Sequence, residues 1–302
     1  MIYDAIVIGA GPAGLTAAIY LKRANLNVAI IEKAAPGGKM TQTFNIENYP
    51  GFNQISGPDL SLTMYEQVIN LGTPHLYGDV QNIRKENNIF YIETDLETLQ
   101  AKRVIVATGT VSRLLNVSGE QDYLGRGISF CAICDGLFYK GKEVAVIGAG
   151  NSAFEESLYL SRVVKKIHII NRNTHFRADA ILVDEVNKTS NIQIYNQSEV
   201  VDFFGNGDLK GLNIYNKETK STTSLYVDGV FIYIGFDPAT EFLKNMNVLD
   251  ERGYLIVNED LESKVSGLFG AGDCLNKKIR QIATSIGDGA LAASSVIRTC
   301  HK

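Results

Sequence analysis

Two cysteines separated by two residues are the strongest candidates for chemistry in the sequence. Cys131 and Cys134 enclose Ala-Ile and are followed at once by Asp135 and Gly136. Thiols at this spacing can form and break a disulfide reversibly, and a nearby positive charge or helix N-terminus lowers a thiol pKa so that the reactive thiolate forms. Asp135 is placed to exchange a proton with the departing thiolate, or else to cap a helix. The pattern predicts a redox-active pair with Asp135 as its acid–base group.

Two other uses of a Cys-x-x-Cys pair have less support. A zinc site needs further ligands, but the remaining candidates are four histidines, Cys274 and Cys300, and there is no second Cys-x-x-Cys. A purely structural disulfide is rare in cytosolic proteins, and four cysteines in 302 residues are too few for a disulfide-stapled scaffold. We therefore expect no metal site, and we assign no function to Cys274 or Cys300.

A glycine-rich turn near the N-terminus indicates a dinucleotide site. An apolar run over residues 2–8 leads into the turn, a helical pattern follows it, and a second apolar run over 28–31 ends at Glu32. The turn consists of Gly9, Ala10, Gly11, Pro12, Ala13 and Gly14. Its glycines would let the backbone approach a pyrophosphate at the helix N-terminus, and Glu32 could bond both ribose hydroxyls. This arrangement favours FAD or NAD over NADP, the alternative being a turn that only packs a helix on a sheet.

The same pattern returns in the second half of the chain. A strand-like run over 143–147 precedes a glycine turn, a helical pattern and another apolar run over 166–170. This turn contains Gly148, Gly150, Asn151 and Ser152. At the position of Glu32 it has Asn171 followed by Arg172, and Arg177 is close in sequence. Loss of the carboxylate and gain of a guanidinium suit a ribose 2′-phosphate, although both arginines could be solvated surface charges. Two dinucleotide sites in one chain suggest electron transfer between them.

The repeat also predicts the fold. Antiparallel strands are expected after each unit, near 80–85 and 89–94 in the first copy and near 191–204 and 209–215 in the second. We predict an α/β fold of two Rossmann-like three-layer dinucleotide-binding domains, the second inserted into the first. Residues 1–113 and 237–302 are expected to form the first dinucleotide-binding domain, and residues 114–236 the second, which carries the cysteine pair.

Composition and hydropathy exclude several classes of protein. The chain is 45% hydrophobic and 21% charged, with a net charge of −4. These values do not fit a disordered chain, a fibre or a basic nucleic-acid binder. The uncharged run over residues 5–21 follows Asp4, is short for a spanning helix and is interrupted by glycines. We therefore expect a cytoplasmic protein that binds neither nucleic acid nor a membrane.

Several motifs together resemble the low-molecular-weight thioredoxin reductases. Besides the two glycine turns and Cys131-Ala-Ile-Cys134-Asp135-Gly136, they are Ala107-Thr108-Gly109, Gly270-Ala-Gly-Asp273 and Arg280-Gln281. The motifs occur in the same order as in the family and cover nearly the whole chain. The most specific of them is the cysteine pair inside the second nucleotide domain. The resemblance implies a homodimeric FAD enzyme that moves electrons from NADPH through the flavin to a disulfide of Cys131 and Cys134, and on to thioredoxin.

The resemblance also implies roles for individual residues. Cys134 would face the flavin, Cys131 would attack thioredoxin, and Asp135 would be the acid–base group. The aperiodic loop over residues 33–58 is long enough to fold over a cofactor, and it contains two more candidate residues, Gly38 and Asn48. The residues expected at FAD are Gly9, Gly11, Pro12, Ala13, Gly14, Glu32, Gly38, Asn48, Ala107, Thr108, Gly109, Asp273, Arg280 and Gln281. Those expected at NADPH are Gly148, Gly150, Asn151, Ser152, Arg172 and Arg177.

One departure from the family pattern bears on the electron donor. The family usually has His-Arg-Arg and then a further Arg four residues later, whereas this chain has Asn171-Arg172-Asn173 and then Arg177. A weaker grip on the 2′-phosphate is expected, and some relatives accept electrons from ferredoxin instead. We expect NADPH, with ferredoxin or another disulfide protein as alternatives. A redox-sensing binding protein without turnover is a further alternative, but it leaves the second nucleotide site unexplained.

Overall fold

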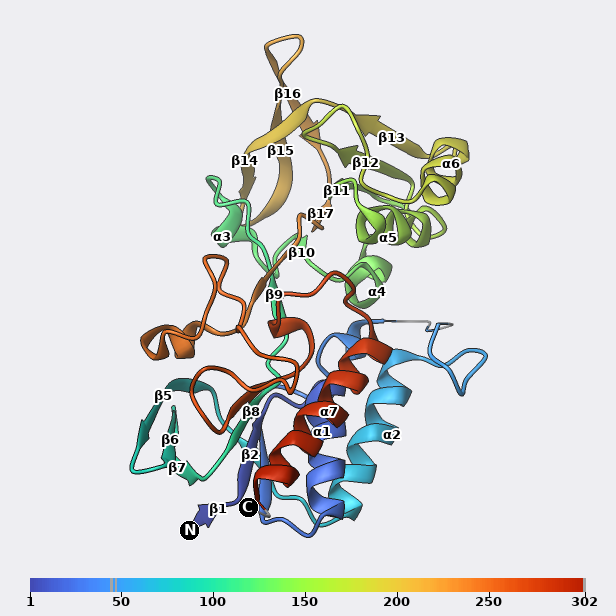
Figure 1. Cartoon of the computed structure of the whole chain (residues 1–302). Coiled ribbons are helices and arrows are strands. Elements are labelled where there is room, and N and C mark those ends of the chain that lie inside the picture. Colours follow the sequence, from blue (N-terminus) through green and yellow to red (C-terminus); the bar gives the residue numbers. More distant parts are fainter. Residues whose placement is uncertain (44–45, 47, 301–302) are drawn as a thin grey trace. The chain divides into compact units, whose positions relative to one another are not determined.

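The chain divides into two compact units, one inserted into the other (Figure 1). In the computed structural model, which describes residues 1–43, 46 and 48–300 without the side chains of Gln42, Ile133 and Cys134, the first unit comprises Met1–Val111 and Asp237–Lys302 and the second Ser112–Phe236. Each unit contains a parallel sheet, helices and a second sheet, which is mixed in the first unit and antiparallel in the second. The predicted α/β fold of two such units is confirmed.

The first unit is built on a five-stranded parallel sheet. Its strands, in spatial order, are β19 (Leu268–Gly270), β8 (Val104–Val106), β2 (Ala5–Ile8), β3 (Val28–Glu32) and β4 (His75–Tyr77). Every residue of β2 and β8 is buried, which explains why these strands are continuous apolar runs without alternation. The carboxyl ends of β2 and β3 therefore lie next to each other, and they carry the first glycine turn and Glu32.

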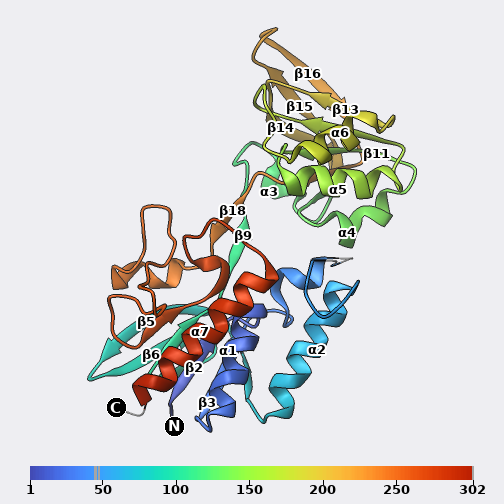
Figure 2. The same ribbon diagram turned by 45° about the vertical axis from the view of Figure 1, so that its right-hand side comes forward.

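Three helices pack side by side in this unit, as Figures 1 and 2 show. They are α1 (Pro12–Arg23), α2 (Gly57–Asn70) and α7 (Ile282–Cys300). Helix α1 begins within the glycine turn, at Pro12, a position where the missing N–H of proline costs nothing. Small residues on α7, among them Gly289, allow its close approach to α1, because a Cβ on Gly289 would lie 2.2 Å from the carbonyl oxygen of Ala13.

A four-stranded sheet forms the third layer of the first unit. Its order is β1 (Ile2–Tyr3), β7 (Thr98–Ala101), β6 (Ile89–Thr94) and β5 (Val80–Glu86). The turn between β5 and β6 is Asn87-Asn88, and both residues have positive φ, 48° and 64°, which suits a tight hairpin. The loop over residues 33–58 contains η1 (Gly38–Gln42), and the segment before α7 contains η3 (Glu241–Met246) and η4 (Gly272–Cys274).

The second unit repeats the parallel sheet. Its strand order is β10 (Ile128–Ser129), β17 (Gly229–Ile232), β11 (Glu143–Ile147), β12 (Lys166–Ile170) and β13 (Ile192–Tyr195). The helical segments are α3 (Glu120–Tyr123), α4 (Ala132–Asp135), η2 (Gly136–Tyr139), α5 (Asn151–Ser161) and α6 (Ala180–Lys188). Helix α5 begins within the second glycine turn just as α1 begins within the first.

One expected strand is divided in two. The sequence predicts a single strand near 191–204, but β13 ends at Tyr195 and β14 (Ser198–Asn206) belongs to a separate antiparallel sheet with β15 (Asp208–Asn216) and β16 (Ser221–Tyr226). The break falls at Asn196-Gln197, where Gln197 has a φ of 53°. A left-handed residue interrupts extended backbone, so the chain changes sheets there.

Two short strands carry the chain between the units. They are β9 (Thr110–Ser112) and β18 (Phe236–Pro238), which form a two-stranded sheet. On one side of them Ala239 N donates to Gly109 O over 3.0 Å, and on the other Arg113 N donates to Gly235 O over 3.0 Å. None of the helices in the described ranges has the length and hydropathy needed to cross a bilayer.

Candidate functional site

The cysteine pair lies around α4, directly after β10. Cys131 immediately precedes this short helix, is half-buried and is disulfide-bonded. Cys274 and Cys300 have free thiols. The side chain of Cys134 lies outside the described part of the chain, so its expected role stays a prediction.

Asp135 is tied to the backbone of Cys131 through Ser129. The hydroxyl of Ser129 donates to Asp135 Oδ2 over 2.6 Å, and the backbone N–H of Cys131 donates to Ser129 Oγ over 3.0 Å. Among the described residues, Asp135 makes no side-chain capping bond at the start of η2, although it occupies the N-cap position. The carboxylate is therefore engaged with the cysteine segment, and its alternative role as a helix cap is not what the structure shows.

Tyr233 contacts the cysteine segment, Glu156 acts on Tyr233, and neither is among the predicted residues. The phenol oxygen of Tyr233 accepts from the backbone N–H of Ala132 over 2.9 Å. Burial raises the pKa of Tyr233, with the negative charges of Glu156 and Asp135 adding to the effect. Burial also raises the pKa of Glu156 to about 7, with a further contribution from Glu155. Tyr233 therefore keeps its proton, whereas Glu156 gains or loses its proton close to neutral pH.

A cavity of about 560 Å³ occupies the second unit. It brings together all six residues predicted for the second nucleotide, which are Gly148, Gly150, Asn151, Ser152, Arg172 and Arg177. His175 and Tyr233 line it as well. The two arginines are exposed and come from the loop after β12, whose Arg177 N–H donates to Ala149 O in the glycine turn over 2.8 Å. The cavity thus combines a glycine turn with two cationic side chains.

The glycine turns have the same local geometry in both units. Gly148 has a φ of 129°, and a Cβ there would lie 2.2 Å from Tyr233 O. Gly9 has a φ of 103°, and its Cβ would lie 2.4 Å from Ala107 O. At Gly11 and Gly150 an added Cβ would meet no described atom within 4 Å, so open space lies beside each helix N-terminus. Such space next to unpaired helical N–H groups fits a pyrophosphate.

Glu32 closes the first glycine turn. Its Oε2 accepts from Ala10 N over 2.8 Å, and its Oε1 accepts from Lys33 N and Ala34 N, each over 2.9 Å. A carboxylate has about four lone-pair sites, so one site on Oε2 is left for a ribose hydroxyl. The long loop reaches the same turn, because Gly37 N donates to Ala10 O over 2.7 Å and a Cβ on Gly38 would lie 3.4 Å from Gly11 Cα.

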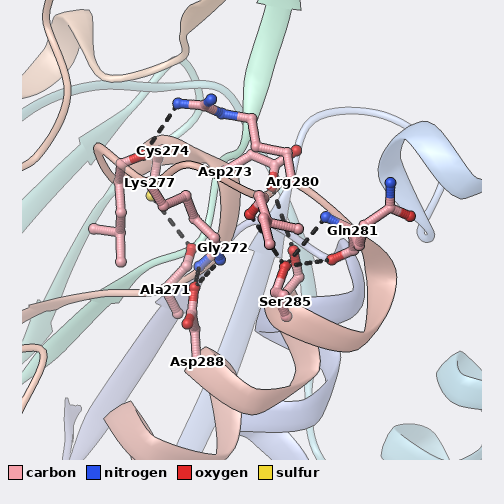
Figure 3. A network of polar contacts seen from close by, with 12 residues as sticks. Ala271, Gly272, Asp273, Cys274, Lys277, Arg280, Gln281, Ser285 and Asp288 are labelled. Atoms are coloured by element: carbon pink, nitrogen blue, oxygen red, sulfur yellow. Dashed lines mark hydrogen bonds and ion pairs between the residues drawn. The ribbon is translucent and has the colours of Figure 1, made fainter. Parts of the chain in front are cut away.

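The other end of the first site is a polar network at the start of α7 (Figure 3). Gly272 N donates to Asp288 Oδ2 over 2.9 Å, and Asp288 pairs with Lys277. Ser285 Oγ lies 3.5 Å from Asp273 Oδ1. Gln281 accepts from Asn48 over 3.1 Å, so these two predicted residues meet although they are far apart in sequence.

Arg280 retains binding capacity in this network. Its guanidinium lies 4.9 Å from the ring centroid of Tyr254 and donates to Leu275 O, while its buried Nε has no hydrogen-bond partner within the described ranges. A buried polar atom without a partner is costly, so the site fits a ligand that supplies an acceptor. The first unit therefore fits a dinucleotide that extends from Glu32 to Arg280.

Lys39 was not predicted as a site residue but belongs to the same region. Its Nζ lies 2.5 Å from Thr110 Oγ1, and burial lowers its pKa to about 8, with Arg280 lowering it further and Asp273 opposing the shift. Of the remaining predicted residues, Thr108 donates to Ala239 O over 2.7 Å. The described residues include no group of three or more His, Cys, Asp or Glu side chains arranged to hold a metal ion.

Comparison with known proteins gives consistent results. The family model for pyridine nucleotide-disulphide oxidoreductases matches residues 3–289. Thioredoxin reductase of Ureaplasma parvum is 44% identical over 97% of this chain and 95% of its own. Thioredoxin reductase of Bacillus subtilis is 40% identical over 98% of this chain and 94% of its own. The crystal structure of Lactococcus lactis thioredoxin reductase superposes with a TM-score of 0.93 at 38% identity, covering 98% of both chains.

Proposed function

Because this chain belongs to the pyridine nucleotide-disulphide oxidoreductase family, we propose that it reduces oxidised thioredoxin with electrons that pass from NADPH through bound FAD to the cysteine pair. Its similarity to thioredoxin reductases over nearly the whole chain supports this function. The observation that carries the proposal is that one compact unit holds both the disulfide-bonded Cys131 and a cavity lined by a glycine turn and two arginines. A nicotinamide-dependent disulfide reductase needs both a nucleotide site and a reducible disulfide.

We assign FAD to the first unit. When bound, FAD supplies two-electron transfer between the nicotinamide and the disulfide. Three features of the chain would hold it: the open space at Gly11 suits the pyrophosphate, the spare lone pair of Glu32 suits the adenosine ribose, and the unpaired Nε of Arg280 suits an acceptor at the opposite end. The contact between Asn48 and Gln281 braces the loop that would cover the cofactor.

We assign NADPH to the cavity of the second unit. Arg172 and Arg177 are both exposed at its wall and bring positive charge without a competing carboxylate at position 171. A charge-assisted bond from a guanidinium to phosphate is strong and planar, so these side chains would favour the 2′-phosphate over a free hydroxyl. His175, which lines the same wall, would support the phosphate.

The cysteine pair would transfer electrons to thioredoxin by disulfide exchange. The Cys131 thiolate attacks one sulfur of the thioredoxin disulfide, and the other thioredoxin sulfur leaves as a thiolate. Cys134 then attacks Cys131, which releases the reduced thioredoxin and restores the disulfide of this chain. Asp135, held through Ser129 against the Cys131 segment, would give or take the proton on a departing thiolate.

An anaerobic titration tests this function. The purified protein should be yellow, NADPH should bleach the flavin absorbance, and oxidised thioredoxin should restore it. If reduced ferredoxin bleaches the flavin and NADPH does not, the electron donor is ferredoxin and not NADPH. If oxidised thioredoxin does not reoxidise the reduced flavin, thioredoxin is not the substrate. We also propose that the protein is a cytoplasmic homodimer, which light scattering and cell fractionation would test.

A further inference from the structure

Glu156 lies on the face of α5 that packs against the cysteine segment. Residues three or four positions apart share a helix face. One turn before Glu156, Ser152 lines the nucleotide cavity, and one turn after it, Tyr159 and Leu160 lie next to Gly136, where an added Cβ would meet their side chains at 3.4 and 2.9 Å. Helices α4 and α5 are in contact. Glu156 is therefore positioned between the cavity and the turn that follows Cys134.

One oxygen of the Glu156 carboxyl group is buried without a partner in the described part of the chain. Its Oε2 is inaccessible to solvent and has no hydrogen-bond partner among the residues described. The titratable groups that interact with it are Glu155 on its own helix and Tyr233 after β17, and Asp135 of α4 acts on the same phenol. These groups are acidic, and none supplies a positive charge. A buried carboxylate without a cation or donor is unfavourable, so Glu156 takes up a proton close to neutral pH.

Tyr233 links this carboxyl group to the redox pair. Its phenol oxygen accepts from the N–H of Ala132, the residue directly after Cys131, while the charge of Glu156 acts on the same phenol. Tyr233 thus contacts the cysteine backbone directly and also lies within the electrostatic reach of Glu156.

We propose that Glu156 is a positioning residue for disulfide exchange, which holds a proton beside the cysteine pair and acts on it through Tyr233. Reduction of a disulfide by two electrons forms two thiolates, which must take up protons from their surroundings. A neutral Glu156 adds no negative charge to that of Asp135 near the thiolate of Cys131, whereas an ionised Glu156 does and so disfavours that thiolate. This proposal rests on the proposed function of the cysteine pair.

The test measures the thiol of Cys131 directly. In holoenzyme carrying Cys134→Ser and reduced with dithiothreitol, the rate of alkylation at Cys131 by iodoacetamide is followed by mass spectrometry between pH 5.5 and 9. Glu156→Gln is expected to accelerate alkylation at pH 8 by about threefold, equivalent to half a pKa unit, and to leave it unchanged at pH 5.5. A purely structural role would not produce a change confined to the higher pH.

Two further variants define the route and the specificity of the effect. Tyr233→Phe should weaken the effect of Glu156 on the rate of alkylation at Cys131. Adding Glu156→Gln to Tyr233→Phe should then change that rate little further. Glu155→Gln, on the exposed side of the same helix, should keep the pH-dependent step and move it to lower pH, because the Glu155 charge helps to keep Glu156 protonated. Identical profiles for Glu156→Gln and its parent would overturn the proposal, as would an undiminished effect in the Tyr233→Phe background. Neither result depends on thioredoxin turnover, so the proposed function is tested separately.

Discussion

The side chains of Asn171 and Asn196 are joined by a hydrogen bond of 2.9 Å, from Nδ2 of Asn171 to Oδ1 of Asn196. The two residues follow the neighbouring strands β12 and β13, and Asn171 Oδ1 also accepts from Asn173 N over 3.2 Å. Asn171 is only 3% exposed. It therefore braces the wall of the nucleotide cavity, while Glu32 at the corresponding place in the first unit keeps a free lone pair toward its turn.

This brace changes what Asn171→Glu is expected to do. From the sequence, the substitution recreates the Glu32 arrangement and should shift preference toward NADH. In the structure, glutamate would lose the donor to Asn196 and bury a charge, which costs several times more than the hydrogen bond itself. We expect weaker reduction of the flavin by both nucleotides and a lower thermal midpoint. Stopped-flow reduction with NADPH and NADH measures this, and a clean switch to NADH at unchanged stability would contradict it.

Arg172→Ala should separate the two nucleotides. A guanidinium–phosphate contact is worth roughly 1.5–3 kcal/mol, so the concentration of NADPH needed for half-maximal flavin reduction should rise about 10- to 100-fold. The concentration of NADH needed for half-maximal flavin reduction should stay unchanged, because NADH lacks the 2′-phosphate. Arg162→Ala is the matched control, because Arg162 is exposed in the same unit but does not line the cavity. Equal losses with both nucleotides would refute the phosphate contact.

The two cysteines should differ in a trapping experiment. With Cys134→Ser, Cys131 should attack thioredoxin and remain joined to it, because the thiol that would release it is absent. Cys131→Ser should form no such complex, and both variants should still bind FAD. Non-reducing electrophoresis detects the adduct, with Cys300→Ser as a control for the other accessible thiol. A complex that forms only with Cys131→Ser would reverse the two roles.

Glu32→Gln should weaken flavin binding. The amide can accept at only one atom, so it would lose backbone bonds to Ala10 or to Lys33 and Ala34 together with the ribose contact. We expect about a tenfold rise in the dissociation constant of FAD, measured by flavin fluorescence after dilution, and mass analysis of released flavin should give FAD rather than FMN. Glu97→Gln, at an exposed turn, should retain wild-type affinity.

Glu156 should make stability depend on pH. Its pKa is raised from 4.5 to about 7, so the folded protein binds the proton more tightly than the unfolded chain, and stability is lost as pH rises through this window. Glu156→Gln cannot ionise. Its thermal midpoint should match the wild type near pH 5 and exceed it by roughly 2–6 °C at pH 8, for a difference of about 1–3 kcal/mol. A constant offset at both pH values would contradict this account.

Much of this protein could be predicted from local sequence. Each βαβ unit combines a buried apolar run, a glycine turn and a helical pattern within about 30 residues, and such short-range signals specify their structure almost independently of the rest of the chain. The glycine turns, Glu32, Arg172 and the cysteine pair could therefore be recognised in advance. The strand expected near 191–204 was wrong in extent, because periodicity does not reveal that the chain changes sheets at Gln197.

Other features depend on tertiary contacts. Tyr233 reaches Ala132 across 101 positions of sequence, Asn48 meets Gln281 across 233, and Lys39 meets Thr110 across 71. No spacing rule connects such residues. Glu156 looks in sequence like one of two adjacent helix glutamates, and only folding leaves Glu155 exposed and buries Glu156. The sequence by itself determined which cofactor-binding units are present, whereas the packing of distant elements decided which acids are desolvated, because burial and unpaired hydrogen-bonding atoms are properties of the folded chain alone.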